Sequence, residues 1–124
     1  MNIDVSTGEL VDRVTILSIK IKKIKNKEKL ENVRKRYECL KTLMEEIGIT
    51  IDAGEFIELK EINLRLWDAE DVIRLKEKKK IFDENFIQLP RIIYLKNGNR
   101  VTLKRKINLK CVSELIEEKE YVDY

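Results

Sequence analysis

Apolar residues recur at alternating intervals of three and four along the first half of the chain, and this spacing limits the fold more than any other feature. A first stripe runs over residues 10–24, and a second runs over residues 30–47 and ends at Gly48. Each stripe lies on one side of an α-helix, because 3.6 residues complete one turn. The short connection around Asn26 predicts that the two helices pack as an antiparallel hairpin. The first stripe consists of Leu10, Val14, Leu17, Ile21 and Ile24, and the second of Leu30, Val33, Tyr37, Leu40, Met44 and Ile47.

The composition supports one helical domain. The 124 residues fit a single domain, 1–124, and they include only one Pro and four Gly. Apolar residues make up 43% of the chain and charged residues 40%, which suits amphipathic helices with charged outer faces. We therefore predict an all-α fold, a bundle of about four helices built from two helical hairpins.

The charges and the N-terminal residues indicate which cellular location and which classes of partner to expect. The net charge of +3 is not typical of a nucleic-acid-binding protein, although residues 91–110 are strongly basic and include no acidic residue. No apolar run reaches membrane-spanning length, and the N-terminal residues lack a signal-peptide pattern. The two cysteines, Cys39 and Cys111, are too few for a disulfide framework. We expect a cytoplasmic protein with neither a membrane nor a nucleic acid as partner.

Capping patterns predict where the helices begin. Ser6 and Glu9 form a capping box, in which the Ser6 hydroxyl accepts from the Glu9 amide while the Glu9 carboxylate reaches back. Asn26 is expected to end the first helix and cap the second. A second capping box, formed by Asp52 and Glu55, predicts a third helix that extends to about residue 80.

The segment after residue 83 is compatible with two structures. Apolar spacing over residues 86–93 continues the helical pattern, but Pro90 inside a helix costs about 3 kcal/mol unless the helix starts or kinks there. Asn97-Gly98 lies between two apolar runs, which is typical of a type I′ turn in a β-hairpin. Local patterns alone leave the hairpin at least as favoured as the helix.

Motifs spread over most of the chain resemble those of a known family. They begin with the stretch from Ser6 to Leu17 and continue with Asn63, Leu66-Trp67-Asp68, Glu70-Asp71, Ile73-Arg74, Phe82-Asp83, Phe86-Ile87, Tyr94, Asn97, Arg100, Leu103-Lys104, Ile107-Asn108, Ser113-Glu114-Leu115 and Glu117-Glu118-Lys119. The chain resembles a small uncharacterised family of bacterial and phage proteins, described as a domain of unknown function. The resemblance implies a long fourth helix, although members usually have helix-forming residues where this chain has Pro90 and Gly98. It implies no particular activity.

A polar layer between the third and fourth helices is the main candidate site. On the third helix the polar side chains share one face, roughly 100° from the apolar stripe, and those of the fourth segment share a face if it is helical. Guanidinium and ammonium groups beside amides and an aromatic ring suit an anionic or sugar-like ligand. The alternative is a buried network without a ligand, in which Glu70 pairs with Arg100 or Arg74. The predicted ligand-binding residues are Asn63, Trp67, Glu70, Arg74, Asn97, Arg100 and Lys104.

Metal binding and known catalytic motifs find little support in the sequence. Carboxylates gather at residues 9–12 and 68–71, but the repeated glutamate pairs of helical metal-dependent hydrolases are missing. Glu9 and Asp12 are better explained by the helix cap and the helix dipole. The chain has no His, and no Ser lies in a nucleophile motif. We predict no metal and no cofactor, and the sequence leaves enzymatic activity undecided.

Two functions of different classes are compatible with these patterns. The first is a small binding protein for an anionic metabolite such as a nucleotide-sugar, with Arg74, Arg100 and Lys104 taking the charge. The second is a helical interaction module or homodimerising scaffold, whose first two apolar stripes mate with a second copy. An enzyme of unknown reaction is a weaker third alternative. The acidic end, from Glu117 onward, is expected either to fold back on the basic helices or to fray.

Overall fold

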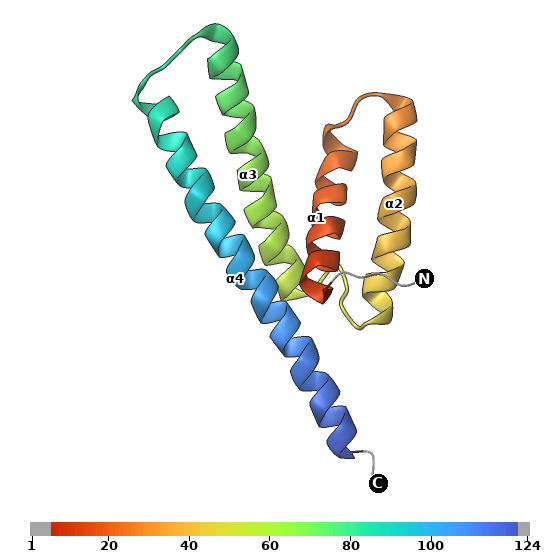
Figure 1. Cartoon of the computed structure of the whole chain (residues 1–124). Coiled ribbons are helices and arrows are strands. Elements are labelled where there is room, and N and C mark those ends of the chain that lie inside the picture. Colours follow the sequence, from red (N-terminus) through yellow and green to blue (C-terminus); the bar gives the residue numbers. More distant parts are fainter. Residues whose placement is uncertain (1–5, 122–124) are drawn as a thin grey trace.

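The computed structural model consists of four α-helices arranged as two hairpins (Figure 1). It describes the backbone of residues 6–121 and the side chains of residues 6–111, so the predicted fold-back of the acidic end lies outside the described side chains. Within the described residues there is no β-strand, and the predicted all-α fold is confirmed. The helices are α1 (Thr7–Lys23), α2 (Lys27–Glu46), α3 (Gly54–Lys79) and α4 (Glu84–Tyr121).

The helix α1 lies at the centre of the fold and packs against the other three. In the described part of the chain α2 packs on α1 alone, whereas α3 and α4 pack on each other and on α1. Figure 1 shows α1 and α2 as one hairpin beside a longer hairpin of α3 and α4, with α4 continuing past the first turns of α1 and α3. The predicted pairing of α1 with α2 is confirmed.

The core takes side chains from all four helices. Its buried members come from both hairpins, and Met44 is the one residue of α2 that is fully buried. In α1 the buried surface is wider than the predicted stripe, because Val11 and Thr15 are also fully buried. Since the rest of the chain covers most of this stripe, it is not available to a second copy as the sequence suggested. The core cluster consists of Leu10, Val11, Val14, Met44, Phe56, Leu59, Leu103 and Ile107.

Side-chain caps fix the starts of the first two helices. The backbone amide of Glu9 donates to Ser6 Oγ at 3.2 Å, and that of Lys29 donates to Asn26 Oδ1 at 3.1 Å, as predicted. The Glu9 carboxylate does not complete the capping box, because it pairs with Lys104 on α4 instead. Gly48 follows α2 with a φ of +91°, a left-handed conformation that ends the helix.

The predicted cap of α3 at Asp52 is wrong. The helix begins one residue later than a cap at Asp52 requires, with Ala53 in the capping position and no side-chain hydrogen bond there. The Glu55 carboxylate, which the capping box assigned to the turn, pairs with Lys110 on α4. The helix ends at Lys79, and Lys80 has a left-handed φ of 55°, close to the predicted end.

The β-hairpin alternative for residues 91–104 is also wrong, because α4 runs without interruption through Pro90 and Gly98. The buried residues Leu89, Leu103 and Ile107 repeat with helical spacing and line one side of α4. Burial of this side against α3 and α1 favours the helix over the turn that Asn97-Gly98 prefers locally. Both turn residues are exposed.

The helices α1 and α4 come closest at Gly8. A Cβ atom at this position would lie 2.6 Å from the backbone oxygen of Lys104. The Gly8 amide also donates to Asn108 Oδ1 at 2.7 Å, so a free amide of the first helical turn finds a partner on α4. Only glycine allows this approach without displacing one of the two helices.

We expect Gly8→Ala to destabilise the protein by about 1–3 kcal/mol, because a methyl group forces the backbones of α1 and α4 apart. Gly98→Ala is the matched control. It lies inside a helix with open space around it, and it should stabilise the chain by about 0.5–1 kcal/mol. Urea unfolding followed by circular dichroism measures both. Equal effects of the two substitutions would contradict the close approach.

Candidate functional site

A buried carboxylate, Asp12, lies where α1, α3 and α4 meet. Asp12 is 1% exposed. Arg100 on α4 holds it with both arms of the guanidinium: Nε donates to Oδ1 at 2.9 Å, and Nη2 donates to Oδ2. Such a bidentate pair is among the strongest side-chain interactions in proteins. It joins residues that are 88 positions apart in the chain.

Asn63 on α3 completes the shell around this carboxylate. Its Nδ2 atom donates to Asp12 Oδ1 at 2.9 Å and to Thr15 Oγ1 at 2.7 Å. The Thr15 hydroxyl in turn donates to the backbone oxygen of Asp12 at 2.7 Å. Among the described residues, no buried side-chain nitrogen or oxygen lacks a hydrogen-bond partner. The arrangement is therefore complete without a ligand.

Lys104 adds a second positive charge one turn along α4. Its Nζ pairs with the Glu9 carboxylate and lies 4.0 Å from Asp12 Oδ2. The two carboxylates of α1 are thus balanced by two cations of α4. We call Glu9, Asp12, Thr15, Asn63, Arg100 and Lys104 the Asp12 network.

The electrostatics of the Asp12 network favour the ionised form of the Asp12 carboxyl. Burial by itself raises the pKa of the Asp12 carboxyl, but hydrogen bonds from Arg100 and Asn63, with the charges of Arg100 and Lys104, outweigh it. The pKa of Asp12 therefore lies below its ordinary value. The hydrogen bond to Asp12 raises the pKa of Arg100 in spite of burial, and the charges of Glu9 and Glu70 act in the same direction.

The structure brings together only some of the predicted ligand-binding residues. Asn63, Arg100 and Lys104 meet in the Asp12 network, where the carboxylates of α1 engage them. Trp67 is half-buried. Glu70, Arg74 and Asn97 are exposed, and Arg74 pairs with Asp71 at 2.5 Å rather than with Glu70. The assignment of these residues to a ligand stays a prediction.

Sequence reasoning missed Asp12 and Thr15 as partners in this network and assigned Asp12 to the helix cap. A second stripe on α1 carries the missing information, since Gly8, Asp12, Thr15 and Ile19 follow intervals of four, three and four and are all buried. A carboxylate on such a stripe requires a cation or hydrogen-bond donors beside it.

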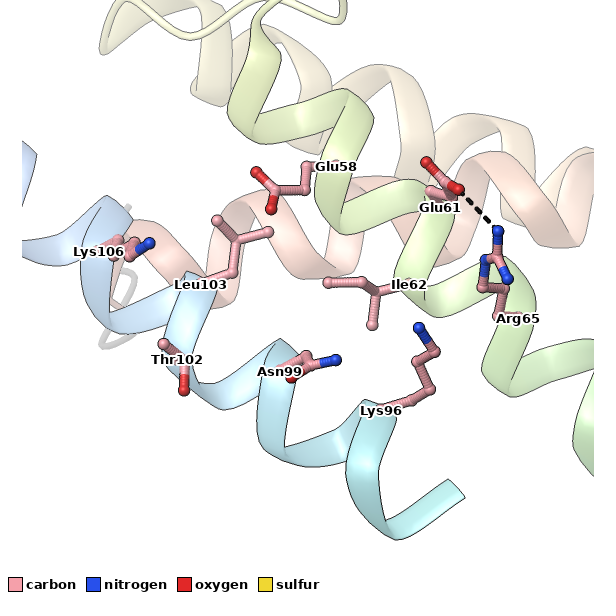
Figure 2. A pocket seen from close by; sticks show the side chains of 9 residues that line it. All are labelled: Glu58, Glu61, Ile62, Arg65, Lys96, Asn99, Thr102, Leu103 and Lys106. Atoms are coloured by element: carbon pink, nitrogen blue, oxygen red, sulfur yellow. Dashed lines mark hydrogen bonds and ion pairs between the residues drawn. The ribbon is translucent and has the colours of Figure 1, made fainter. Parts of the chain in front are cut away.

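A groove between α3 and α4 opens on the side away from α1. Its volume is about 450 Å³, within the usual range of small-molecule sites. Figure 2 shows Ile62 and Leu103 between the two helices, with polar side chains around them. None of the predicted ligand-binding residues lines this groove. Its polar residues are Glu58, Glu61 and Arg65 on α3, and Lys96, Asn99, Thr102 and Lys106 on α4.

Most polar side chains of the groove have no partner within the described part of the chain. Glu61 accepts from Arg65 at 3.1 Å, and the Thr102 hydroxyl donates to the Gly98 carbonyl. The remaining four form no hydrogen bond or ion pair with the residues that the structure describes. They are Glu58, Lys96, Asn99 and Lys106. The groove thus differs from the Asp12 network, whose groups are all engaged.

Residues 6–111 contain no group of three side chains that could together hold a metal ion. The carboxylates that the sequence grouped are engaged by cations: Asp68 lies 3.8 Å from Lys23, and Asp71 pairs with Arg74. Over the same described part of the chain, no helix combines the length and the apolar character needed to cross a bilayer.

Comparison with protein-family models finds a match over nearly the whole chain. The model of a family of unknown function, DUF6165, matches residues 1–123. The chain belongs to this family. No curated protein and no solved structure matches it. Family membership therefore adds no activity to what the geometry shows.

Replacing Arg100 should cost about 3 kcal/mol of unfolding free energy, because Asp12 is left as a buried charge without its partner. Urea unfolding of Arg100→Ala measures the loss. Arg65→Ala is the matched control, since it removes an exposed pair with Glu61 and should cost less than about 1 kcal/mol. The double variant Asp12→Asn/Arg100→Ala should lose less than the sum of its single variants. An Arg100→Ala variant as stable as Arg65→Ala would contradict the central role of this pair.

Acid should weaken the fold through Asp12. Its pKa in the fold lies below the ordinary 3.8, so its stabilising effect is complete above that value and is lost as pH falls below it. We expect the unfolding free energy to drop as pH falls below about 4, and Asp12→Asn to reduce that drop. Half-buried Glu55 and exposed Asp83 also have lowered pKa values. The test therefore compares the pH profile of Asp12→Asn with that of the unsubstituted chain. Parallel pH profiles would refute the assignment.

Proposed function

We propose that the protein is a small binding protein that takes an anionic, sugar-like ligand in the groove between α3 and α4. The observation that carries this proposal is the set of polar side chains in the groove that lack partners within the described chain. Polar groups that a fold leaves unpaired in a concave site are available to a ligand. Each lysine can bind an anion, and the amide and carboxylate can bind hydroxyl groups.

The positions of the cations favour an elongated ligand. Lys96 and Lys106 lie on the groove side of α4, and Asn99 and Thr102 lie between them. Ten residues of helix span about 15 Å, so a ligand that contacts both ends has to extend along the groove. Lys96 is half-buried and is directed toward Ile62 and α3 in Figure 2. A nucleotide-sugar, with a charged diphosphate and neutral hydroxyl groups, has this combination of length and chemistry.

The ligand is proposed for the groove and not for the Asp12 network, because the cations of that network are already paired. Arg100 and Lys104 already neutralise Asp12 and Glu9, so a ligand there would have to displace a carboxylate that is nearly fully buried. Such a displacement costs several kcal/mol. In the groove, Lys96 and Lys106 are available without breaking any pair.

An interaction module is the second candidate. It is favoured by the completeness of the Asp12 network, which sets the packing of three helices and needs no ligand. Under this function the groove is a solvated surface, and its lysines contribute only to solubility. The two candidates differ in what substitutions in the groove do to ligand binding.

Titration calorimetry with UDP-glucose as the probe tests the groove, with glucose and inorganic phosphate in separate titrations. We expect Lys96→Ala and Lys106→Ala each to weaken binding by about tenfold or more, the usual loss for a hydrogen bond to a charged group. Lys78→Ala, an exposed lysine of α3 outside the groove, should leave binding unchanged.

The outcome separates the candidates. Absence of binding to all three probes favours the interaction module. Binding that survives both groove substitutions but is lost in Asn97→Ala or Glu70→Ala would place the ligand on the side facing α1, where the sequence predicted it, and would refute the groove.

A further inference from the structure

Three large side chains on the outer side of α4 are exposed at regular intervals of seven residues. Ile87 is 66% exposed, Tyr94 is 77% exposed and Val101 is 48% exposed. A seven-residue interval keeps side chains on one side of a helix, and it is the interval with which paired helices contact each other. We call these three residues the outer stripe.

Nothing within the described chain covers the outer stripe. The core side of α4 carries Leu89, Leu103 and Ile107, which lie roughly opposite on the helix. The groove and the Asp12 network use the two remaining sides. An exposed apolar stripe about 21 Å long on one side of a helix usually marks an interface.

We propose that the outer stripe pairs with the outer stripe of a second copy of this chain. The two α4 helices run antiparallel, and the two-fold axis passes near Tyr94. Ile87 and Val101 lie seven residues on either side of Tyr94. An antiparallel pair centred there therefore sets Ile87 of each copy against Val101 of the other, and the two tyrosines against each other.

The charges at the two ends of the stripe fit this arrangement. Glu84 lies ten residues before Tyr94 and Arg105 lies eleven residues after it. The two-fold axis therefore brings Glu84 of each copy beside Arg105 of the other. Both side chains are exposed, and neither forms an ion pair within the described chain. A parallel pair would instead set Arg105 against Arg105, which repels.

Gly98 also suits the antiparallel register. A Cβ atom at Gly98 would meet no atom of the described residues within 4 Å. The axis places Gly98 opposite residues 90 and 91 of the other copy. A glycine there leaves room for the long side chain of Arg91. Gly98 costs about 1 kcal/mol relative to alanine inside a helix. Because nothing within the described residues requires a glycine there, an approaching helix gives it a reason.

The register of Glu84 with Arg105 favours a second copy over an anionic surface. Segment 85–113 contains basic residues and no acidic one, so an anionic surface would attract it along its whole length. A second copy offers an apolar stripe of the same interval and an acid in register with Arg105. A single pair of helices buries less than the roughly 800 Å² per partner of a standard interface. The dimer should therefore form reversibly and depend on concentration.

Sedimentation equilibrium of the full chain tests the proposal. We expect a monomer–dimer equilibrium that Tyr94→Glu or Ile87→Glu shifts to monomer, with an unchanged helical spectrum because both side chains are exposed. Ile57→Glu is the matched control, because Ile57 is 55% exposed on α3, away from the outer stripe. It should leave the dimer intact.

Charge exchange tests the register. Glu84→Arg and Arg105→Glu should each weaken the dimer by about tenfold or more, and the double variant should restore it. A monomer at all concentrations would overturn the proposal, whether or not the chain sediments with phosphatidylglycerol vesicles. A dimer that persists in both Tyr94→Glu and Ile87→Glu would also overturn it. Failure of the double variant to recover would overturn the antiparallel register.

Discussion

The bidentate pair between Asp12 and Arg100 is the interaction on which the arrangement of the helices depends. A carboxylate that is 1% exposed cannot remain ionised without a cation, so α4 has to place Arg100 at one height along α1. Asn63 fixes α3 at the same height through the same carboxylate. Apolar packing alone tolerates a shift of one turn between helices, whereas this set of hydrogen bonds does not. The network thus specifies the register of α1, α3 and α4.

The hairpin of α3 and α4 divides its polar residues between two sides with different properties. On the side of α1 the charges pair with each other, and the arrangement is complete without further molecules. On the opposite side the groove leaves Lys96, Lys106 and Glu58 without partners in the described chain. The cationic residues of α4 therefore have different roles according to the side of the helix that they occupy. A lysine that stabilises the fold is a poor ligand contact, because recruiting it breaks an existing pair.

The sequence predicts most of the fold and only part of the site, for identifiable reasons. Spacing and caps such as Ser6 and Asn26 are local features, so helix existence and helix starts follow from them. The cap at Asp52 does not form, and the glutamates of both predicted capping boxes, Glu9 and Glu55, pair with lysines of α4, which no local pattern contains. The groove could not be predicted for a related reason. Its lining is set by which side of α4 faces α1, and Arg100 decides that side through a contact with Asp12, 88 positions away.

The continuity of α4 depends on the contacts that several of its sides make. Pro90 and Gly98 both disfavour a continuous helix, and local patterns at Asn97-Gly98 favour a turn. The helix nevertheless continues, because its core side is buried at Leu89, Leu103 and Ile107. One side packs on α3, one holds the Asp12 network, one lines the groove, and the outer stripe is left exposed. A turn at Gly98 would separate Leu89 from Arg100 and Leu103, so burial of the core side and the pairing of Arg100 with Asp12 together outweigh the local preference.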